Sequence, residues 1–289
     1  MTLKLPSVRL AWDDKRAHIG SMPSLFHRSI TGLTVGLSML LGAASAFAQE
    51  DARLFFGRDD RVFVTPASMP WSAVGKLVFD SGSHCSGALV SPRVVLTAAH
   101  CFYRDMEGGA PVYELPSGFR AGHHKEGASA EADVISFWIP PGYDSDRRSG
   151  SSMDNGRDYA FMLLDEPIGD EEGYFDVHRM TVDELNLATA RGWSEISQAG
   201  YSGDHADQLT AHMGCAITGY TDLNIVQHMC DIVPGDSGSP LFIEGPQGYE
   251  IVAVNSAIYY GPRPYNIAVD SRAFAGDLDR YINRYDPIR

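Results

Sequence analysis

Short runs of β-branched and aromatic residues, separated by turn residues, recur along most of this 289-residue chain. Such runs are typical of strands, and the clusters of Gly, Pro, Asn, Asp and Ser between them are typical of turns. Many short strands and few helices predict an all-β fold of the sandwich or barrel type. We expect strands at residues 74–79, 88–98, 159–164, 240–243 and 251–258.

One segment has a clear helical period, and it lies near the end of the chain. Its apolar residues, at three- or four-residue spacing, are Phe274, Leu278, Ile282 and Tyr285. This spacing predicts an amphipathic terminal helix. Loops are expected at residues 107–111 and 145–152, where glycine, serine and charged residues gather.

The composition and the charge limit the kinds of partner. With 44% hydrophobic and 21% charged residues, the chain is an ordinary globular protein, long enough for one large domain or two small ones. Its formal net charge is -14. Nucleic-acid binding needs a basic face that neutralises phosphates, so we expect no nucleic-acid partner.

Residues 1–48 have the features of a cleavable export signal. A mostly apolar run at residues 30–41 follows a basic pair and leads to a small-x-small motif that ends at Ala48. The run is too short for a permanent membrane helix, so we expect no stable membrane anchor. Met22 would give a signal of normal length and is the expected true start. The protein is therefore predicted to be secreted or periplasmic, with Gln49 as its first residue after export.

All four cysteines follow the export signal. An even number of cysteines in an exported chain indicates disulfides, here two, and free buried thiols are the weaker alternative. Four cysteines allow three connectivities, of which the local pairs Cys85–Cys101 and Cys215–Cys230 are the simplest.

The stretch GDSGSP, residues 235–240, fits either a turn between two strands or a loop that presents a nucleophilic serine. A nucleophilic serine needs a base, and the base needs an orienting carboxylate. All ten histidines precede Ser237, which excludes the α/β-hydrolase order, in which histidine comes last. Ser239 also stands where a nucleophile elbow requires glycine.

The histidines differ in their surroundings. Most lie in polar or irregular segments and are interpreted as surface or loop residues. These are His123, His124, His178, His205, His212 and His228. No HExxH motif or other close His/Cys spacing indicates zinc, and we predict neither a metal nor a cofactor. His100 differs because it lies at the end of CSGALVSPRVVLTAAHC, residues 85–101.

That segment resembles the chymotrypsin-like (trypsin-like) serine proteases. In this family the catalytic histidine lies in TAAHC, and the adjacent cysteine bonds an upstream cysteine at the spacing of Cys85 and Cys101. DYAFMLLDEPI, which starts at Asp158, resembles the family segment that carries the catalytic aspartate. The order His100, Asp158, Ser237 is then the chymotrypsin order. The stretches CDIVPGDSGSP and GRDDRVFVT look most like the bacterial glutamyl endopeptidase branch.

The resemblance implies two six-stranded antiparallel β-barrels of chymotrypsin-like type and a C-terminal helix. The first barrel, residues 62–172, would carry the histidine and the aspartate. The second barrel, residues 173–271, would carry the serine. Residues 272–289 would form the helix and tail, and residues 49–61 a short propeptide or N-terminal arm.

The resemblance also implies a mechanism. Ser237 would attack a peptide carbonyl, His100 would take its proton, and Asp158 would orient the histidine. The backbone N–H groups of Gly235 and Ser237 would form the oxyanion hole. The segment expected to pair with the substrate as an added strand consists of Ser256, Ala257 and Ile258.

Three residues bear on the specificity pocket, and they point to different preferences. Asp231 stands where trypsins place the aspartate that binds Arg or Lys. Asn255 stands where glutamyl endopeptidases have a histidine, so a glutamate preference loses its main cation. Ile267 stands where deep-pocket members have glycine. We expect Ile267 to fill the pocket, which favours small or medium side chains, with basic specificity as the alternative.

The implied function is that of a secreted serine endopeptidase, a monomer without a cofactor that acts on protein or peptide substrates. Two alternatives belong to other classes: a non-catalytic binding protein with a protease fold, and an esterase or acyl transferase that uses the same triad. Activation by trimming is also open, because Asp236 resembles the aspartate that binds a newly cut N-terminal amine in animal members. The possible cut sites are Arg53, Arg58 and Arg61.

Overall fold

The structure is a computed structural model that describes residues 55–104, 112–125, 127–144, 156–191, 195–259 and 262–287. All of these belong to one unit of the chain, Ala46–Arg289. The export signal, the Met22 start and the loops expected at residues 107–111 and 145–152 lie outside the described residues. Within the described part of the chain, no helix combines the length and the apolar character needed to cross a membrane.

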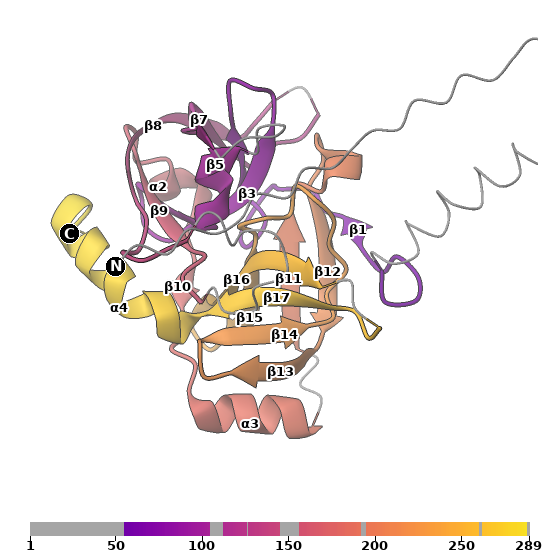
Figure 1. Ribbon diagram of the computed structural model, residues 1–289. Helices are drawn as coiled ribbons and strands as arrows, with labels where there is room; N and C mark the ends of the chain where they lie inside the picture. Colours follow the sequence, from indigo (N-terminus) through magenta and orange to yellow (C-terminus); the bar gives the residue numbers. More distant parts are fainter. Residues whose placement is uncertain are drawn as a thin grey trace, which may run out of the picture. The chain divides into compact units, whose positions relative to one another are not determined.

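Six antiparallel strands close into a barrel in the first half of the chain (Figure 1). The order around the barrel is β2-β3-β4-β9-β8-β7. The strands are β2 (Val74–Val78), β3 (His84–Leu89), β4 (Val94–Thr97), β7 (Gly118–Ala121), β8 (Ala130–Trp138) and β9 (Ala160–Leu164). Every residue of β4 and β9 is buried, as expected for a small barrel filled by side chains. This confirms the first predicted barrel.

Residues 88–98, expected as one strand, belong to two strands of this barrel. A turn separates β3 from β4. In this turn the Val90 amide donates to the Val94 carbonyl at 2.8 Å. The Ser91 hydroxyl accepts a bond from the Val94 amide at 3.1 Å. Pro92 has no N–H to donate to a ladder, which explains why the apolar run turns here.

The second half of the chain forms a nine-stranded sheet. Its order is β1-β12-β11-β15-β16-β17-β14-β13, and β10 pairs with β16. The strands are β1 (Val62–Phe63), β10 (Asp176–Val177), β11 (Ile196–Gly200), β12 (Thr210–Cys215), β13 (Ile217–Thr221), β14 (Ile225–His228), β15 (Pro240–Gly245), β16 (Gly248–Tyr259) and β17 (Tyr265–Asp270). β12 and β13 lie near opposite ends of this order, yet only Ala216 separates them in the chain. The sheet therefore curls back on itself, while hydrogen-bonded closure into a second barrel stays a prediction.

The N-terminal strand belongs to this sheet and not to the first barrel. β1 pairs with β12, with Val62 opposite Ala211 and Phe63 opposite Thr210. The barrel itself begins at β2, later than the boundary predicted at residue 62. This crossing brings the residues that precede β1 next to the second sheet.

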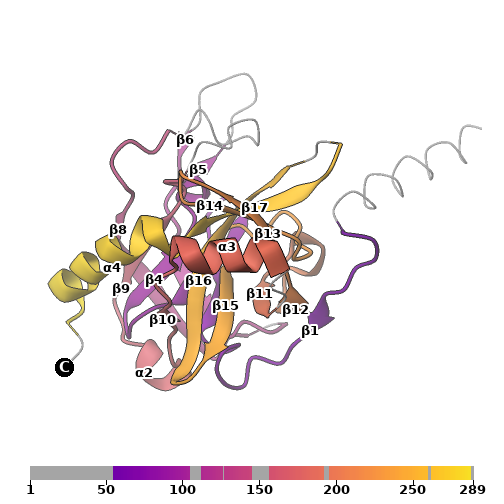
Figure 2. The ribbon, with the colours of Figure 1, turned by 90° about the horizontal axis from the view of Figure 1, so that it is seen from below.

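Two longer helices and several short elements complete the fold. α4 (Ser271–Tyr285) confirms the predicted terminal helix, with Phe274 and Leu278 buried. α3 (Val182–Arg191), which the sequence does not predict, packs against β13 (Figure 1; Figure 2). Its leucines are divided between a buried position, Leu185, and an exposed one, Leu187, so its helical period is weak. The short elements are α2 (Gly169–Glu172), η1 (Ala99–Phe102), η3 (Gly203–His205), β5 (Tyr103–Arg104) and β6 (Val112–Tyr113).

One apolar cluster continues from the barrel into the second sheet. It joins barrel residues such as Phe161 to sheet residues such as Phe242 and Val254. The rings of Trp71 and Phe175 also contact Phe242, with centroids 5.9 and 5.2 Å away. Because interiors are close-packed, a shared core fixes the two halves against one another and holds the residues at their junction in place.

Candidate active site

His100 and Asp158 meet at one end of the barrel. β4 and β9 are paired, with Thr97 opposite Ala160. His100 follows β4 in η1 and Asp158 precedes β9, so the strand pairing brings the two together. His100 Nδ1 lies 2.8 Å from Asp158 Oδ2, and the His100 amide donates to Asp158 Oδ1 at 2.8 Å. The carboxylate therefore holds both the ring and the backbone of the histidine.

The environment of Asp158 favours its charged form. Burial alone would raise its pKa, but the charge and hydrogen bonds of His100, together with the Ser256 hydroxyl, bring the pKa below its ordinary value. Asp158 is therefore ionised at neutral pH. An ionised carboxylate can only accept, so His100 Nδ1 carries the proton between them, and Nε2 is left as the acceptor.

Ser256 reaches Asp158 because β16 is irregular at this point. The β16–β17 register shifts between Asn255, which lies opposite Ala268, and Ala257, which lies opposite Ile267. An extra residue in one strand re-aims its side chain, and the Ser256 hydroxyl donates to Asp158 Oδ2. The sequence predicts Ser256 only as a residue that pairs with substrate, because a register shift leaves no local signal in the sequence.

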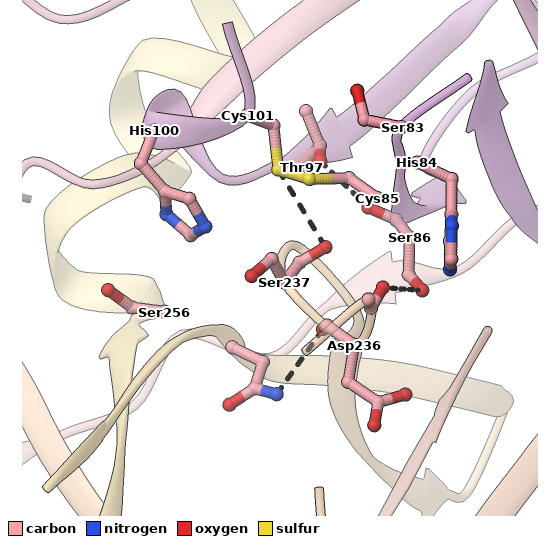
Figure 3. The surroundings of a disulfide bond; sticks show 12 residues. Ser83, His84, Cys85, Ser86, Thr97, His100, Cys101, Asp236, Ser237 and Ser256 are labelled. Carbon is pink, nitrogen blue, oxygen red and sulfur yellow. Dashed lines mark hydrogen bonds between the residues drawn. A yellow bond between two sulfur atoms is a disulfide. The ribbon is translucent and has the colours of Figure 1, made fainter. Parts of the chain in front are cut away.

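Ser237 lies in a loop that requires glycine on both sides. Gly235 has a φ of 104° and Gly238 a φ of 80°, conformations that other residues rarely adopt. A Cβ on Gly238 would lie 2.4 Å from the backbone oxygen of Ser86, so the loop packs directly on the first barrel. In Figure 3 the Ser237 side chain points toward the His100 ring.

Ser86, in β3, connects the first barrel to this loop. Its amide donates to the Ser237 carbonyl at 2.8 Å, and its hydroxyl donates to the Gly235 carbonyl at 2.9 Å. The same hydroxyl accepts a bond from the Tyr201 amide at 2.8 Å. The sequence prediction did not include Ser86, because Ser86 and Gly235 are 149 positions apart and no local pattern links them.

The backbone of the loop offers two hydrogen-bond donors. Among the described residues, neither the Gly235 amide nor the Ser237 amide donates a hydrogen bond. The peptide unit that carries the Gly235 amide also carries the Pro234 carbonyl. This carbonyl accepts a bond from the Gly203 amide at 2.7 Å. The C=O and N–H of a trans peptide point in opposite directions, so this bond fixes where the Gly235 amide points. Two such amides can bind a developing oxyanion.

Both predicted disulfides are present. Cys85 and Cys101 are joined at an S–S distance of 2.08 Å, next to the loop of Ser237 (Figure 3), and Cys215 and Cys230 at 2.05 Å. The side chains of Cys85, Cys101 and His100 lie close enough together to resemble a metal site. A metal-binding cysteine must be a thiolate, and both sulfurs are in a disulfide, so this cluster does not fit a metal ion.

Asp231 faces the segment of residues 55–61, which we call the N-terminal arm. Its Oδ1 accepts a bond from the Phe56 amide at 3.0 Å, and its Oδ2 from the Asp60 amide at 2.8 Å. Burial alone would raise the pKa of Asp231, but His212 and the two arm amides lower it overall, so the carboxylate is charged. Since both oxygens are engaged by the arm, the structure gives no support to Asp231 as the binding group for a basic side chain.

Asn255 and Ile267 lie on neighbouring strands. Asn255 is 1% exposed, and its side chain contacts His228 and the backbone of the nucleophile loop. Ile267 is 5% exposed and lies opposite Ala257. Ile267 is therefore next to the segment predicted to bind substrate. That segment, Ser256, Ala257 and Ile258, is half-buried at the end of β16.

The interpretation as a surface or loop residue is wrong for His228, which lies in β14 and is 0% exposed. His123 is 4% exposed but does lie in a loop, after β7. His228 tolerates burial because both ring nitrogens have partners: Nε2 lies 3.1 Å from Asn255 Oδ1, and Nδ1 accepts from the Cys230 amide at 3.3 Å. A polar residue in a short strand suggests an exposed face, and partners in distant strands are not visible in the sequence.

Asp236 precedes the nucleophile and is completely buried. Its Oδ2 accepts bonds from the Ser202 hydroxyl at 2.8 Å and the Val233 amide at 2.9 Å, and its Oδ1 from Gln198 Nε2 at 3.3 Å. These donors are neutral. Burial therefore raises the pKa of Asp236 to about 6 despite the three bonds.

Known proteins show a consistent similarity. The chain is 30% identical over 217 residues to a glutamyl endopeptidase of Bacillus licheniformis, an alignment of 73% of this chain and 63% of the relative. It is 26% identical over 215 residues to serine protease 23 of Mus musculus, with 64% of this chain and 52% of the relative aligned. The chain thus spans between half and two thirds of the length of these relatives.

A solved structure and a family model agree with this similarity. A Glu endopeptidase structure in complex with MPD matches with a TM-score of 0.61 and 24% identity, over 78% of this chain and 97% of the other, which supports the fold. The Trypsin family model matches residues 62–275, a range that includes His100, Asp158 and Ser237. The chain therefore belongs to the trypsin family of serine proteases.

Proposed function

We propose that the protein is a serine endopeptidase that hydrolyses peptide bonds through an acyl-enzyme. One observation carries this proposal. The His100–Asp158 pair, joined at 2.8 Å, faces a serine whose loop leaves two amides without an acceptor among the described residues. A nucleophile, a base with its orienting carboxylate and an oxyanion site are the parts that acyl transfer requires.

The reaction proceeds in two halves. Ser237 Oγ bonds to the carbonyl carbon while its proton passes to His100 Nε2, and Asp158 stabilises the imidazolium. The amides of Gly235 and Ser237 donate to the oxyanion. His100 then gives the proton to the leaving nitrogen as the C–N bond breaks. Water, deprotonated by His100, attacks the ester carbon and releases the acid and the free serine.

The proposed specificity is for small or medium side chains before the scissile bond. Ile267 lies opposite Ala257, which belongs to the proposed substrate strand. A bulky side chain at this place would reduce the depth of the specificity pocket. Kinetics on matched peptides with Ala, Val, Arg or Glu test this. A specificity constant for Arg more than about tenfold above that for Ala would contradict it. Ile267→Gly should widen acceptance toward longer side chains.

Four measurements separate the endopeptidase from its alternatives. Wild type should cleave unfolded casein, and an organophosphonate probe should label Ser237. Ser237→Ala and His100→Ala should each lose about a millionfold in turnover, by analogy with characterised serine proteases, and Ser83→Ala, on an exposed serine, should not. Labelling of another serine contradicts the nucleophile. Cleavage of a simple ester without casein favours the esterase, and inactivity on both favours a binding protein.

Export is also part of the proposal. Two disulfides fit an oxidising compartment, and residues 1–48 carry the features of a cleavable signal. N-terminal sequencing of protein recovered from the periplasm or medium should begin at Gln49 or later. Recovery of the full chain from the cytoplasm alone contradicts export.

A further inference from the structure

We propose that Asn255 and His228 are positioning residues of the oxyanion hole, because two consecutive hydrogen bonds from them fix the peptide that presents the Ser237 amide. This inference rests on the proposed function, since it assigns both residues a role in that reaction. Both residues are buried. Each acts by holding another group in place.

The first bond runs from Asn255 to the nucleophile loop. Asn255 Nδ2 donates to the Asp236 carbonyl at 3.3 Å. That carbonyl and the Ser237 amide belong to the same peptide unit, and in a trans unit they point in opposite directions. An anchor on the carbonyl therefore sets the direction of the amide, in the same way that Gly203 anchors the Pro234 carbonyl behind the Gly235 amide.

The backbone of Asn255 strengthens this anchor. Its carbonyl accepts a bond from the Gly238 amide at 2.9 Å, and its amide donates to the Ser239 carbonyl at 2.9 Å. Asn255 thus holds the loop at three points, on both sides of Ser237. These backbone bonds keep the Cα of Asn255 in place beside the loop.

The second bond runs from His228 to Asn255 and determines which way the amide group faces. His228 Nδ1 accepts from the Cys230 amide at 3.3 Å, so the neutral ring carries its proton on Nε2. Nε2 lies 3.1 Å from Asn255 Oδ1 and donates to it. With its oxygen held by His228, the amide must direct its nitrogen toward the Asp236 carbonyl.

Burial makes this chain of bonds persistent. His228 is 0% exposed and Asn255 is 1% exposed, so no solvent competes for either bond. Burial also lowers the pKa of His228 to about 3, and the nearby His212 acts in the same direction. The ring is therefore uncharged at neutral pH, where the bond pattern stays the same.

The test compares four variants of the full chain. Asn255→Leu removes the anchor, and His228→Leu removes the donor that orients it. His228→Gln is the conservative variant, since a Gln amide nitrogen can donate to Asn255 Oδ1. Asn266→Leu is the matched control: Asn266 is also 1% exposed, in the adjacent strand, but its Nδ2 donates to the Cys230 carbonyl and not to residues 235–239.

The measurements are kcat and KM on a peptide amide, the pH midpoint of kcat/KM, and affinity for a peptide aldehyde, which forms an oxyanion in the site. Asn255→Leu should lower kcat about a hundredfold, the usual loss for one oxyanion donor, with KM and the pH midpoint nearly unchanged. Aldehyde affinity should fall by a similar factor. His228→Leu should lose about tenfold and His228→Gln should regain most of it. Asn266→Leu should keep kcat within about threefold.

Several outcomes overturn the inference. One is a folded Asn255→Leu with wild-type kcat, and another is a raised KM at constant kcat, which would indicate ground-state binding. An equal kcat loss in Asn266→Leu would indicate general loosening of the sheet. If Asn255→Leu does not fold, equal kcat in His228→Leu and His228→Gln overturns it. Failure of the proposed function is distinct, because wild type would then be inactive and unlabelled at Ser237.

Discussion

Asp236 is completely buried and has only neutral hydrogen-bond donors among the described residues. Its pKa is therefore raised to about 6, whereas the unfolded chain releases this proton near the ordinary value of 3.8. Between these values the folded state keeps a proton that the unfolded state has lost. Stability therefore falls as the pH rises through this window, by up to about 3 kcal/mol.

Replacing Asp236 by Asn should remove this pH dependence. Asp158 and Asp231 have lowered pKa values and give the opposite slope, but they are present in both proteins. The difference in unfolding free energy between Asp236→Asn and wild type should therefore grow in favour of the variant from about pH 4 to about pH 7. Urea unfolding at several pH values measures it. Asp183→Asn, at an exposed aspartate, serves as control. A stability difference for Asp236→Asn that does not change with pH would contradict the raised pKa of Asp236.

At the scale of elements, His178 joins the start of α3 to the sheet. Its Nε2 lies 2.9 Å from Glu184 Oε1 of α3, and its Nδ1 lies 2.9 Å from Glu250 Oε2 of β16. Burial by itself lowers the pKa of His178, but the two carboxylates raise it above 6.5 overall. Between two carboxylates the protonated ring can donate from both nitrogens, so the bridge is strongest when His178 is charged.

The sign of the pH dependence follows from the raised pKa. The stabilisation is complete below pH 6.5, the ordinary value, and is lost as the pH rises through the higher folded value. Wild type should therefore lose stability relative to His178→Gln as the pH rises from 6.5 through the raised folded pKa. Thermal unfolding of both proteins measures this. His205→Gln, on a histidine 44% exposed, should track wild type, and parallel curves for His178→Gln would refute the bridge.

The two disulfides close loops of similar length at different places in the fold, so their effects on activity can be compared directly. Their sequence separations are 16 and 15 residues, so each should contribute about 3 kcal/mol on the chain-entropy model. The Cys85–Cys101 bond adjoins the nucleophile directly, with Cys101 Sγ 3.8 Å from the Ser237 carbonyl, whereas Cys230 is connected to the site through His228. Paired alanine variants should lose similar stability, measured by denaturant, while kcat/KM falls much more without Cys85–Cys101. Equal losses of activity would show that its position has no effect.

The sequence alone predicts the site residues that lie in short motifs, but it does not predict contacts between residues far apart in the chain. His100, Asp158 and Ser237 each sit in a short motif, so their types, order and neighbouring cysteines could be read directly. The bonds of Asp231 to the arm join residues 175 and 171 positions apart, and no pattern within one element reports such a contact. The burial of His228 and the irregularity at Ser256 depend on strand register, which a single sequence leaves open.

At the scale of the whole molecule, the N-terminal arm precedes β1 and is bound to the second half of the chain. Its amides bind Asp231, and its Arg61 side chain is 2% exposed, 2.9 Å from Asp59 and 2.6 Å from Asp204. A cut after Arg61 would separate the Phe56 and Asp60 amides and the Arg61 side chain from the rest of the chain. A cut after Arg58 would separate the Phe56 amide. Neither position therefore suits an activating cut, and Arg53 lies outside the described residues.

Chains that begin at different residues test the role of the arm. A chain starting at Val62 leaves the buried Asp231 carboxylate without two donors, so its unfolding free energy should drop by about 3 kcal/mol or more. A chain starting at Phe55 keeps both donors and should match the exported protein in stability and in activity on casein. Urea unfolding compares the three. Equal stability of the Val62 chain would mean that the arm contributes nothing.

Ser86 binds the second half of the chain through main-chain atoms: the carbonyls of Gly235 and Ser237 and the amide of Tyr201. Main-chain atoms are the same in every homologue, so this junction does not depend on which side chains surround it. Substitutions around Ser86 therefore need no matching change across this contact, whereas substitutions in the shared apolar core do. A chimera that combines the barrel of one family member with the sheet of another should assemble its site, provided that the shared core, the serine in β3 and the two glycines that flank the nucleophile are kept.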